Sequence, residues 1–254
     1  MITLDLTPDP GPAPRTHRIF RHARVEASLT LRNGEQLLLA LAIPLGLLVL
    51  GATLGRGLGW DGREFPASVL ALGLWSTGFT SLAIITAFER RYGVLERLAA
   101  TPLTRTDLLA GKALATIAIA SGQAVVLAVI AALLGWRPTP DAGQTLVMLL
   151  AAALALVAFA SWALALASVL RAEATLGVAN LIYLVLSLLG GLMVPLQSFP
   201  GSVRGLLVLT PTGALGEALR GWSTGTLDPI VLLPLTAWAL LSALIARKVF
   251  RWMS

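Results

Sequence analysis

The chain has 254 residues, of which 56% are hydrophobic and only 13% are charged. Soluble domains carry about 25% charged residues, so this composition favours an integral membrane protein over a soluble helical one. The absence of cysteine excludes disulfides, thiolate zinc sites and a cysteine nucleophile. Only two histidines occur, His17 and His22, and this argues against a histidine metal site.

The stretch before the first long apolar run divides into two parts. Residues 1–15 contain several prolines and aspartates, and we expect a disordered tail there. Residues 16–36 alternate apolar and charged positions at helical spacing. The apolar positions are Ile19, Phe20, Ala23, Ala27 and Leu31, and the charged ones are Arg18, Arg21, Arg24, Glu26 and Arg32. This pattern predicts an interfacial amphipathic helix on the inner membrane surface; a solvated cytoplasmic helix is the alternative.

Six apolar segments come close to the roughly 20 residues that a bilayer-spanning helix needs. They cover residues 37–54, 67–88, 113–134, 145–170, 175–196 and 229–246. Lipid offers no partner to backbone N–H and C=O groups, so continuous apolar runs favour helices over strands. We therefore predict an all-α membrane protein in which residues 37–254 form one transmembrane domain of six helices.

Lysine and arginine are distributed unequally between the two sides of this layout. Most of them lie in the N-terminal stretch, in the loops after the second and fourth spans, and at the C-terminus. The positive-inside rule then predicts a multi-pass protein of the inner (plasma) membrane with both termini in the cytoplasm. The net charge of +6 would gather on that side, where it suits anionic lipid headgroups better than nucleic acid.

The predicted cytoplasmic loop after the second span, residues 89–112, concentrates charge in an otherwise apolar chain. Gly93 permits a change of chain direction, and Thr101-Pro102 breaks any helix that follows it. Between them, a short helix would carry Glu96 and Arg97 opposite an apolar face of Val94, Leu95, Leu98 and Ala99. Such a helix can rest its apolar face in a groove of a soluble partner; an ordinary positive-inside loop is the alternative.

The next span begins near Gly111-Lys112, which resembles the end of a phosphate-binding loop. The required spacing fails, because position 106 is threonine instead of glycine and Ala113 replaces the hydroxyl residue that would hold magnesium. We therefore expect no ATP site, no bound cofactor and no catalytic activity in this chain, with ATP and magnesium held by a partner. The six apolar cores contain no charged residue, which disfavours a proton-coupled secondary transporter.

Some neutral polar residues do occur inside the predicted spans. Gln123 and Asn180 are the candidates to face a transport pathway or a second copy of the chain. Hydrogen bonding between helices is the alternative.

The segment between the fifth and sixth spans, residues 197–228, has its own pattern. Apolar residues 206–209 are too few to span, and we expect one or two short re-entrant helices over 199–222 that dip into the outer leaflet. A loop in water is the alternative.

Two of these stretches carry a family resemblance. ERRYGVLERLAATPLTRTDLLAGK, residues 89–112, resembles the first cytoplasmic loop of ABC-2 type permeases. VPLQSFPGSVRGLLVLTPTGALGEALRGW, residues 194–222, is similar to the external segment of the same family. The chain departs from the family pattern at Glu89-Arg90-Arg91, which leaves the partner of Arg91 open.

The resemblance implies a coupling helix that docks on an ATPase, beside the N-terminal surface helix. The positions that match the coupling motif are Glu89, Gly93, Leu95, Glu96, Leu98, Thr101, Pro102, Gly111 and Lys112. The positions that match the external motif are Pro200, Pro211, Glu217 and Arg220.

The resemblance also implies a function: the membrane subunit of an ATP-driven ABC exporter. Its partners would be two ABC ATPase (nucleotide-binding) subunits and a second copy of itself or a related permease. With no charged lining, an amphipathic or hydrophobic cargo is expected, and resemblance to drug-resistance members favours a drug or antibiotic. Export of a lipid-linked glycan, or a non-transporting scaffold that recruits an ATPase, are the alternatives.

Overall fold

The computed structural model describes residues 11–55, 57 and 60–250. Every regular element in these ranges is helical, so the predicted all-α class is confirmed for them. Most of the predicted disordered tail, residues 1–15, lies outside the described residues. The α-helices are α1 Arg15–Arg32, α2 Gly34–Leu54, α3 Glu64–Trp75, α4 Leu82–Arg91, α5 Val94–Ala99, α6 Arg105–Leu133, α7 Ala142–Val169, α8 Ala172–Leu189, α9 Gly201–Val208, α10 Pro211–Thr224 and α11 Leu232–Val249. Three short segments complete them: the π-helix η1 Ser76–Ser81 and the 3₁₀ turns η2 Leu196–Ser198 and η3 Pro229–Val231.

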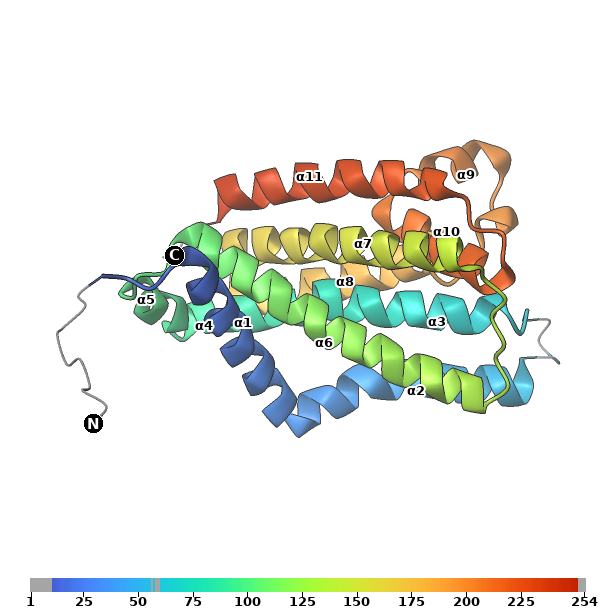
Figure 1. Ribbon diagram of the computed structural model, residues 1–254, viewed down its shortest axis with the longest axis horizontal. Helices are drawn as coiled ribbons and strands as arrows, with labels where there is room; N and C mark the ends of the chain where they lie inside the picture. Colours follow the sequence, from blue (N-terminus) through green and yellow to red (C-terminus); the bar gives the residue numbers. More distant parts are fainter. Residues whose placement is uncertain (1–10, 56, 58–59, 251–254) are drawn as a thin grey trace, which may run out of the picture.

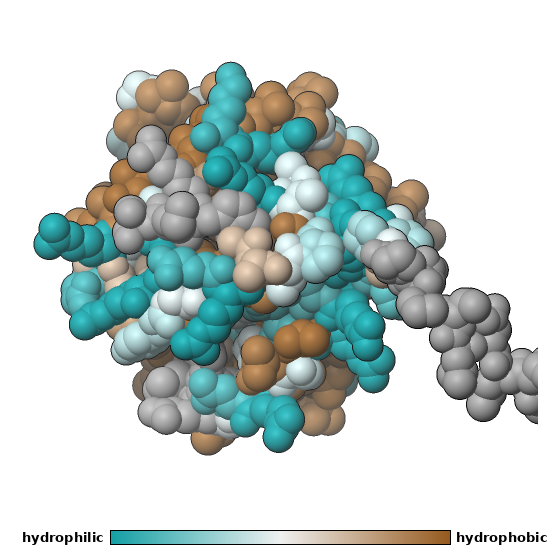
Figure 2. All heavy atoms as spheres, turned by 90° about the vertical axis from the view of Figure 1, so that its left-hand side faces the viewer, coloured by the Kyte–Doolittle hydropathy of each residue, from teal (hydrophilic) through white to brown (hydrophobic). Residues whose placement is uncertain are grey.

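The long helices form an elongated bundle around α7 (Figure 1). Helix α7 packs against α11, α4, α10 and α6, while α1 crosses α6 obliquely. The start of α1, helix α5 and the end of α11 lie at one end of the long axis, and α9 and α10 lie at the other. Hydrophilic side chains gather over the end that carries α5 (Figure 2), which is the end predicted to face the cytoplasm.

Five helical segments in the described ranges are long and apolar enough to cross a membrane. They are Glu64–Arg91, Arg105–Leu133, Ala142–Val169, Ala172–Leu189 and Pro229–Val249. The first of the six predicted spans falls on α2, whose apolar part Ala40–Leu54 is shorter than these. Five spans are therefore supported, and a sixth crossing at α2 stays a prediction.

The second predicted span is one helical segment made of α3, the π-helix η1 and α4 in direct succession. Within η1, Gly78 lies against α7, where a Cβ would come within 2.9 Å of a Leu156 side-chain atom. Trp75 stacks on Phe79 with ring centroids 4.4 Å apart, and Phe159 meets the Trp75 ring edge-on at 4.6 Å. The span is thus held in the centre of the bundle by close contacts with α7.

Two helices, α9 and α10, occupy the segment in which short helices were expected. Helix α10 packs against α3 and α7, and most of its side chains are buried in the protein. The Trp222 ring packs edge-on against Trp136, and its Nε1 donates to Thr145 Oγ1 at 3.1 Å. Helix α10 therefore belongs to the bundle core, and a position of α9 in the outer leaflet stays a prediction.

Candidate functional site

The turn from α4 into α5 depends on Gly93. Its φ is +70°, in the left-handed region that other residues enter only with strain. The turn directs α5 back onto the bundle, where Leu95 is 1% exposed and Leu98 packs beside it on the same core. Glu96 and Arg97 stay exposed. Leu95 is thus covered by the chain itself, whereas Ala99 on the same face is exposed, and docking of this face on a partner stays a prediction.

The segment after α5 breaks where Thr101-Pro102 predicted it. Thr101 Oγ1 donates to Leu98 O at 2.6 Å and closes the end of α5. Helix α6 then opens with a capping box: Asp107 N donates to Thr104 Oγ1, and Thr104 N donates to Asp107 Oδ2, both at 3.2 Å. Because this cap lies well before the apolar run, α6 begins eight residues earlier than the predicted span.

Two arginines fasten the end of α4 to its neighbours. Arg90 donates to Leu170 O at 2.5 Å and also to Ser168 O, both at the end of α7. Arg91 forms an ion pair with Glu173 in the first turn of α8. The partner of Arg91, which the sequence left open, is therefore within the chain.

Helix α1 is fastened to the start of α6 by charge and by close approach. Asp107 is fully buried and pairs with Arg15 at 2.8 Å and with Arg18 at 2.9 Å. Gly111 lies directly under the His22 ring, where a Cβ would come within 2.5 Å of His22 Cδ2. Gly111 is thus a packing position between two helices of this chain and not part of an exposed docking surface.

A buried ionic cluster follows one residue later. Lys112 is 1% exposed, and its Nζ lies 2.9 Å from Glu26 Oε2 and 2.5 Å from Glu89 Oε2. His22 Nε2 lies 3.4 Å from Glu26 Oε1. The cluster therefore joins α1, α4 and α6. Both charges of Glu89 and Lys112 are thus paired inside the chain, and a contact of either residue with an ATPase stays a prediction.

The His22 imidazole is kept neutral by this environment. Burial lowers its pKa below the ordinary value of 6.5, Lys112 lowers it further, and Glu26 opposes both. Sequence reasoning placed Glu26 on the solvent face of its helix and passed over His22. The i, i+4 spacing of these two residues was the available signal, because it puts them on one helix face.

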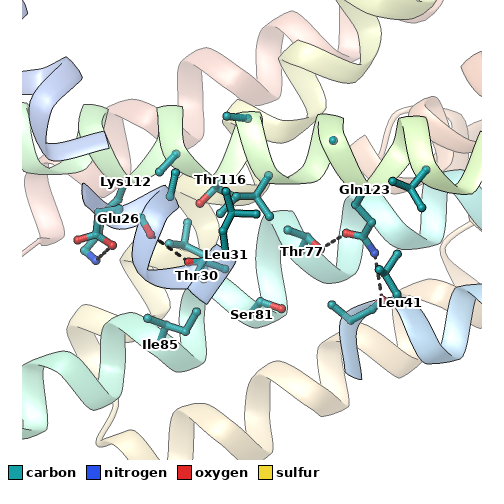
Figure 3. Close-up of a pocket in the computed structure, with 18 residues that line it drawn as sticks. Glu26, Thr30, Leu31, Leu41, Thr77, Ser81, Ile85, Lys112, Thr116 and Gln123 are labelled. Carbon is teal, nitrogen blue, oxygen red and sulfur yellow. Dashed lines mark hydrogen bonds and ion pairs between the residues drawn. The ribbon is translucent and has the colours of Figure 1, made fainter. Parts of the chain in front are cut away.

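A cavity of about 470 Å³ lies beside the cluster, between α1, α2, α4, α6 and η1 (Figure 3). Its apolar walls include Leu31, Leu41, Ile85, Ile119 and Val126. An adjoining hollow of about 740 Å³ shares Glu26, Thr30, Ala40, Ser81 and Ile85 with it and extends to Glu89, Tyr92 and Asn180. Both volumes fall in the range of roughly 300–1,000 Å³ that is usual for small-molecule sites.

The two polar candidates inside the spans both border these hollows. Gln123 is buried; its Nε2 donates to Ala40 O at 3.0 Å, and its Oε1 accepts from Thr77 Oγ1. It therefore bonds between helices while also lining the cavity. Asn180 is exposed on α8, and its Nδ2 donates to Leu176 O at 2.9 Å.

The external motif residues have structural roles at the end of the bundle opposite to α5. Pro200 and Pro211 stand at the starts of α9 and α10. Arg220 is 3% exposed; it donates at 2.7 Å to the carbonyls of Gly191 and Leu192 and pairs with Glu217 Oε1 at 2.7 Å. Within the described ranges no three histidine or acidic side chains lie close enough to hold a metal ion.

Comparison with known protein families agrees with the sequence resemblance. The model of the ABC-2 type transporter family matches residues 20–222, which is more than half of the chain. This stretch includes the helix that carries His22 and Glu26, the loop with Gly93, and helix α10. No curated protein matches the sequence.

Proposed function

The chain belongs to the ABC-2 type transporter family, and we propose that it is the permease subunit of an ATP-driven exporter. Families of this type normally work with an ABC ATPase partner. In our proposal separate ATPase subunits bind ATP and magnesium and dock on α5. The cargo is an amphipathic or hydrophobic compound of the drug or antibiotic kind. A second permease copy, identical or related, completes the pathway.

The observation that carries this proposal is the rigid attachment of α5 to the helix bundle. Gly93 turns it sharply, Leu95 anchors it in the core, and Glu96 and Arg97 remain exposed. Helix α4, to which it is joined, is tied to α7 through Arg90 and to α8 through Arg91. We therefore expect a displacement of α5 by a bound partner to move α4, α7 and α8 with it.

The docking face that follows from this geometry is polar. Helix α5 has six residues, too short to hold its shape without tertiary support. Its apolar side provides that support, so a partner is left with charged and small side chains. We therefore expect charge complementarity, not a hydrophobic groove, to hold the ATPase on this helix.

Charge reversal on α5 tests the docking. Arg97→Glu and Glu96→Lys should each reduce co-purification of the ABC ATPase partner, while membrane insertion and thermal stability stay unchanged. Arg63→Glu is the matched control, because Arg63 is also exposed but directly precedes α3, which begins at the opposite end of the bundle. If both α5 variants retained the ATPase as well as the control does, docking on α5 would be wrong.

The proposed orientation places α5 and both termini in the cytoplasm. The chain has no native cysteine, so single cysteines at Gly62 and Arg171 can report sidedness. Both positions are exposed, and they lie at opposite ends of the bundle. An impermeant thiol reagent added to intact cells should label Gly62→Cys only, and equal labelling of both would overturn the orientation.

A measurement of cargo flux distinguishes an exporter from a scaffold that recruits an ATPase without transporting anything. Vesicles that contain both subunits should accumulate cargo with ATP, and cargo should stimulate ATP hydrolysis. ATPase binding without either response would support the scaffold. Transport of a lipid-linked glycan in the same assay would replace the drug-like cargo.

A further inference from the structure

The buried cluster beside the cavity holds two carboxylates but only one ammonium group. Glu26 and Glu89 both lie against the single ammonium of Lys112, at 2.9 and 2.5 Å. The lowered pKa of His22 leaves its ring without a compensating charge near neutral pH. Two carboxylates therefore share one ammonium in surroundings that are poorly solvated.

The neighbouring arginines do not contact these two carboxylates. Arg15 and Arg18 bond to Asp107, which stands five positions before Lys112 on α6. Five residues of α-helix rise about 7.5 Å, and Arg15 is largely exposed, so solvent weakens its effect on the cluster. Lys112 is therefore the cation that lies in direct contact with Glu26 and Glu89.

Both carboxylates border a hollow instead of being sealed inside the protein. Glu26 lines both hollows, and Glu89 lines the larger one. Their side chains are 16% and 19% exposed, whereas Lys112 is completely enclosed. Figure 3 shows Glu26 at one end of a channel whose far part is lined by Leu41 and Gln123. An entering molecule would thus meet the Glu26 carboxylate beside Lys112 at one end, and mostly apolar walls with a few hydroxyl groups and Gln123 along the rest.

We propose that this cavity binds an organic cation with an apolar body, its positive group against Glu26 and Glu89 and its apolar part among Leu31, Ile85 and Ile119. An anionic ligand is disfavoured, because Lys112, which also lines the cavity, is already shared by two carboxylates. The inference deepens the proposed function, since it names the class of cargo for an exporter. The positive group can belong to a free compound or to the ammonium of a phosphatidylethanolamine headgroup.

Binding of radiolabelled tetraphenylphosphonium to the full-length chain in nonionic detergent tests the site. Glu26→Gln and Glu89→Gln should each raise the Kd about tenfold or more, because each removes one attraction to the cation. Each variant still leaves Lys112 with one carboxylate, so the fold should persist, as checked by gel filtration. Lys112→Gln should act in the opposite direction and lower the Kd. Binding should also weaken from pH 7.5 to pH 5, because protons compete for the same carboxylates.

The walls of the cavity can be tested without touching any charge. Gly122 lines the cavity, and a Cβ placed there meets nothing within 4 Å, so Gly122→Leu should fill the space and reduce binding about tenfold or more. Gly177 on α8 has the same open surroundings but lies outside the cavity. The matched change Gly177→Leu should alter the Kd by no more than about twofold.

The results of the binding assay test the cation site independently of ATPase docking on α5, and they identify the source of the cation. Competition by phosphatidylethanolamine but not by phosphatidylglycerol would assign the site to a lipid ammonium, and its absence would assign it to a free cation. Failure to bind, or binding unaffected by Glu26→Gln, Glu89→Gln and Gly122→Leu, would overturn the site. No ATPase takes part in this assay, so such a failure leaves ATPase docking on α5 standing, and loss of docking leaves the site standing.

Discussion

Replacing Leu95 by alanine distinguishes an internal anchor from a partner contact. Leu95 is 1% exposed within the chain, and removing a buried leucine side chain costs about 2–5 kcal/mol. Helix α5 has six residues and no independent stability, so this loss should fall on its attachment to the bundle. Since about 1.4 kcal/mol is a factor of ten, even the lower figure predicts a roughly 30-fold larger population of detached α5.

Trypsin cleavage after Arg97 measures that population, because Arg97 is exposed but lies inside a folded helix. When opening is fast relative to cleavage, the cleavage rate follows the open fraction. Leu95→Ala should therefore be cleaved about 30-fold faster or more, whereas Glu96→Ala on the same helix should change little. Unchanged cleavage of Leu95→Ala together with loss of ATPase binding would refute the anchoring, because Leu95 would then act on the partner.

Three further predictions concern stability, measured as thermal unfolding of the purified chain in detergent. Gly111→Ala should destabilise by about 1–3 kcal/mol through its clash with the His22 ring, and the added change His22→Ala should restore most of the loss. Arg220→Ala should lower the free energy of unfolding by about 3–5 kcal/mol, because it leaves Glu217 without its ion-pair partner and two buried carbonyls without a donor. Arg220→Lys should recover little of this stability, since an ammonium group lacks the planar guanidinium that donates to several acceptors at once. The lowered His22 pKa makes the folded state prefer the neutral ring, so stability should be full above pH 6.5 and fall as the pH drops below it. The fall should be smaller in His22→Ala; an equal fall in both proteins would contradict the assignment to His22.

Local signals in the sequence accounted for much of the cytoplasmic loop. Gly93 was singled out for a turn and adopts φ +70°, a conformation that follows from the absence of a Cβ. Thr101-Pro102 ends α5, and Thr104 caps α6. Each of these outcomes depends on backbone groups a few residues away, so it is available before any tertiary contact forms.

The faces of the helices were less predictable. Leu95 and Glu26 were assigned by helical spacing to a partner-facing and a solvent-facing side, and both side chains turn out to contact the bundle. Spacing defines which residues share a face, but not what that face meets. A short helix next to a large apolar core buries its leucine there, because this contact costs no association entropy.

The sequence by itself determined that this is a helical membrane protein of the ABC-2 type, with its charge concentrated at one loop and near the termini, because hydropathy and motif chemistry are properties of contiguous residues. Only the tertiary structure decided that Lys112 reaches Glu26, 86 residues away, that Arg91 pairs with Glu173, and that a cavity opens beside Glu26 and Glu89. These features arise where α1, α4 and α6 meet. Charges so far apart along the chain are brought together by helix packing, which no local pattern specifies.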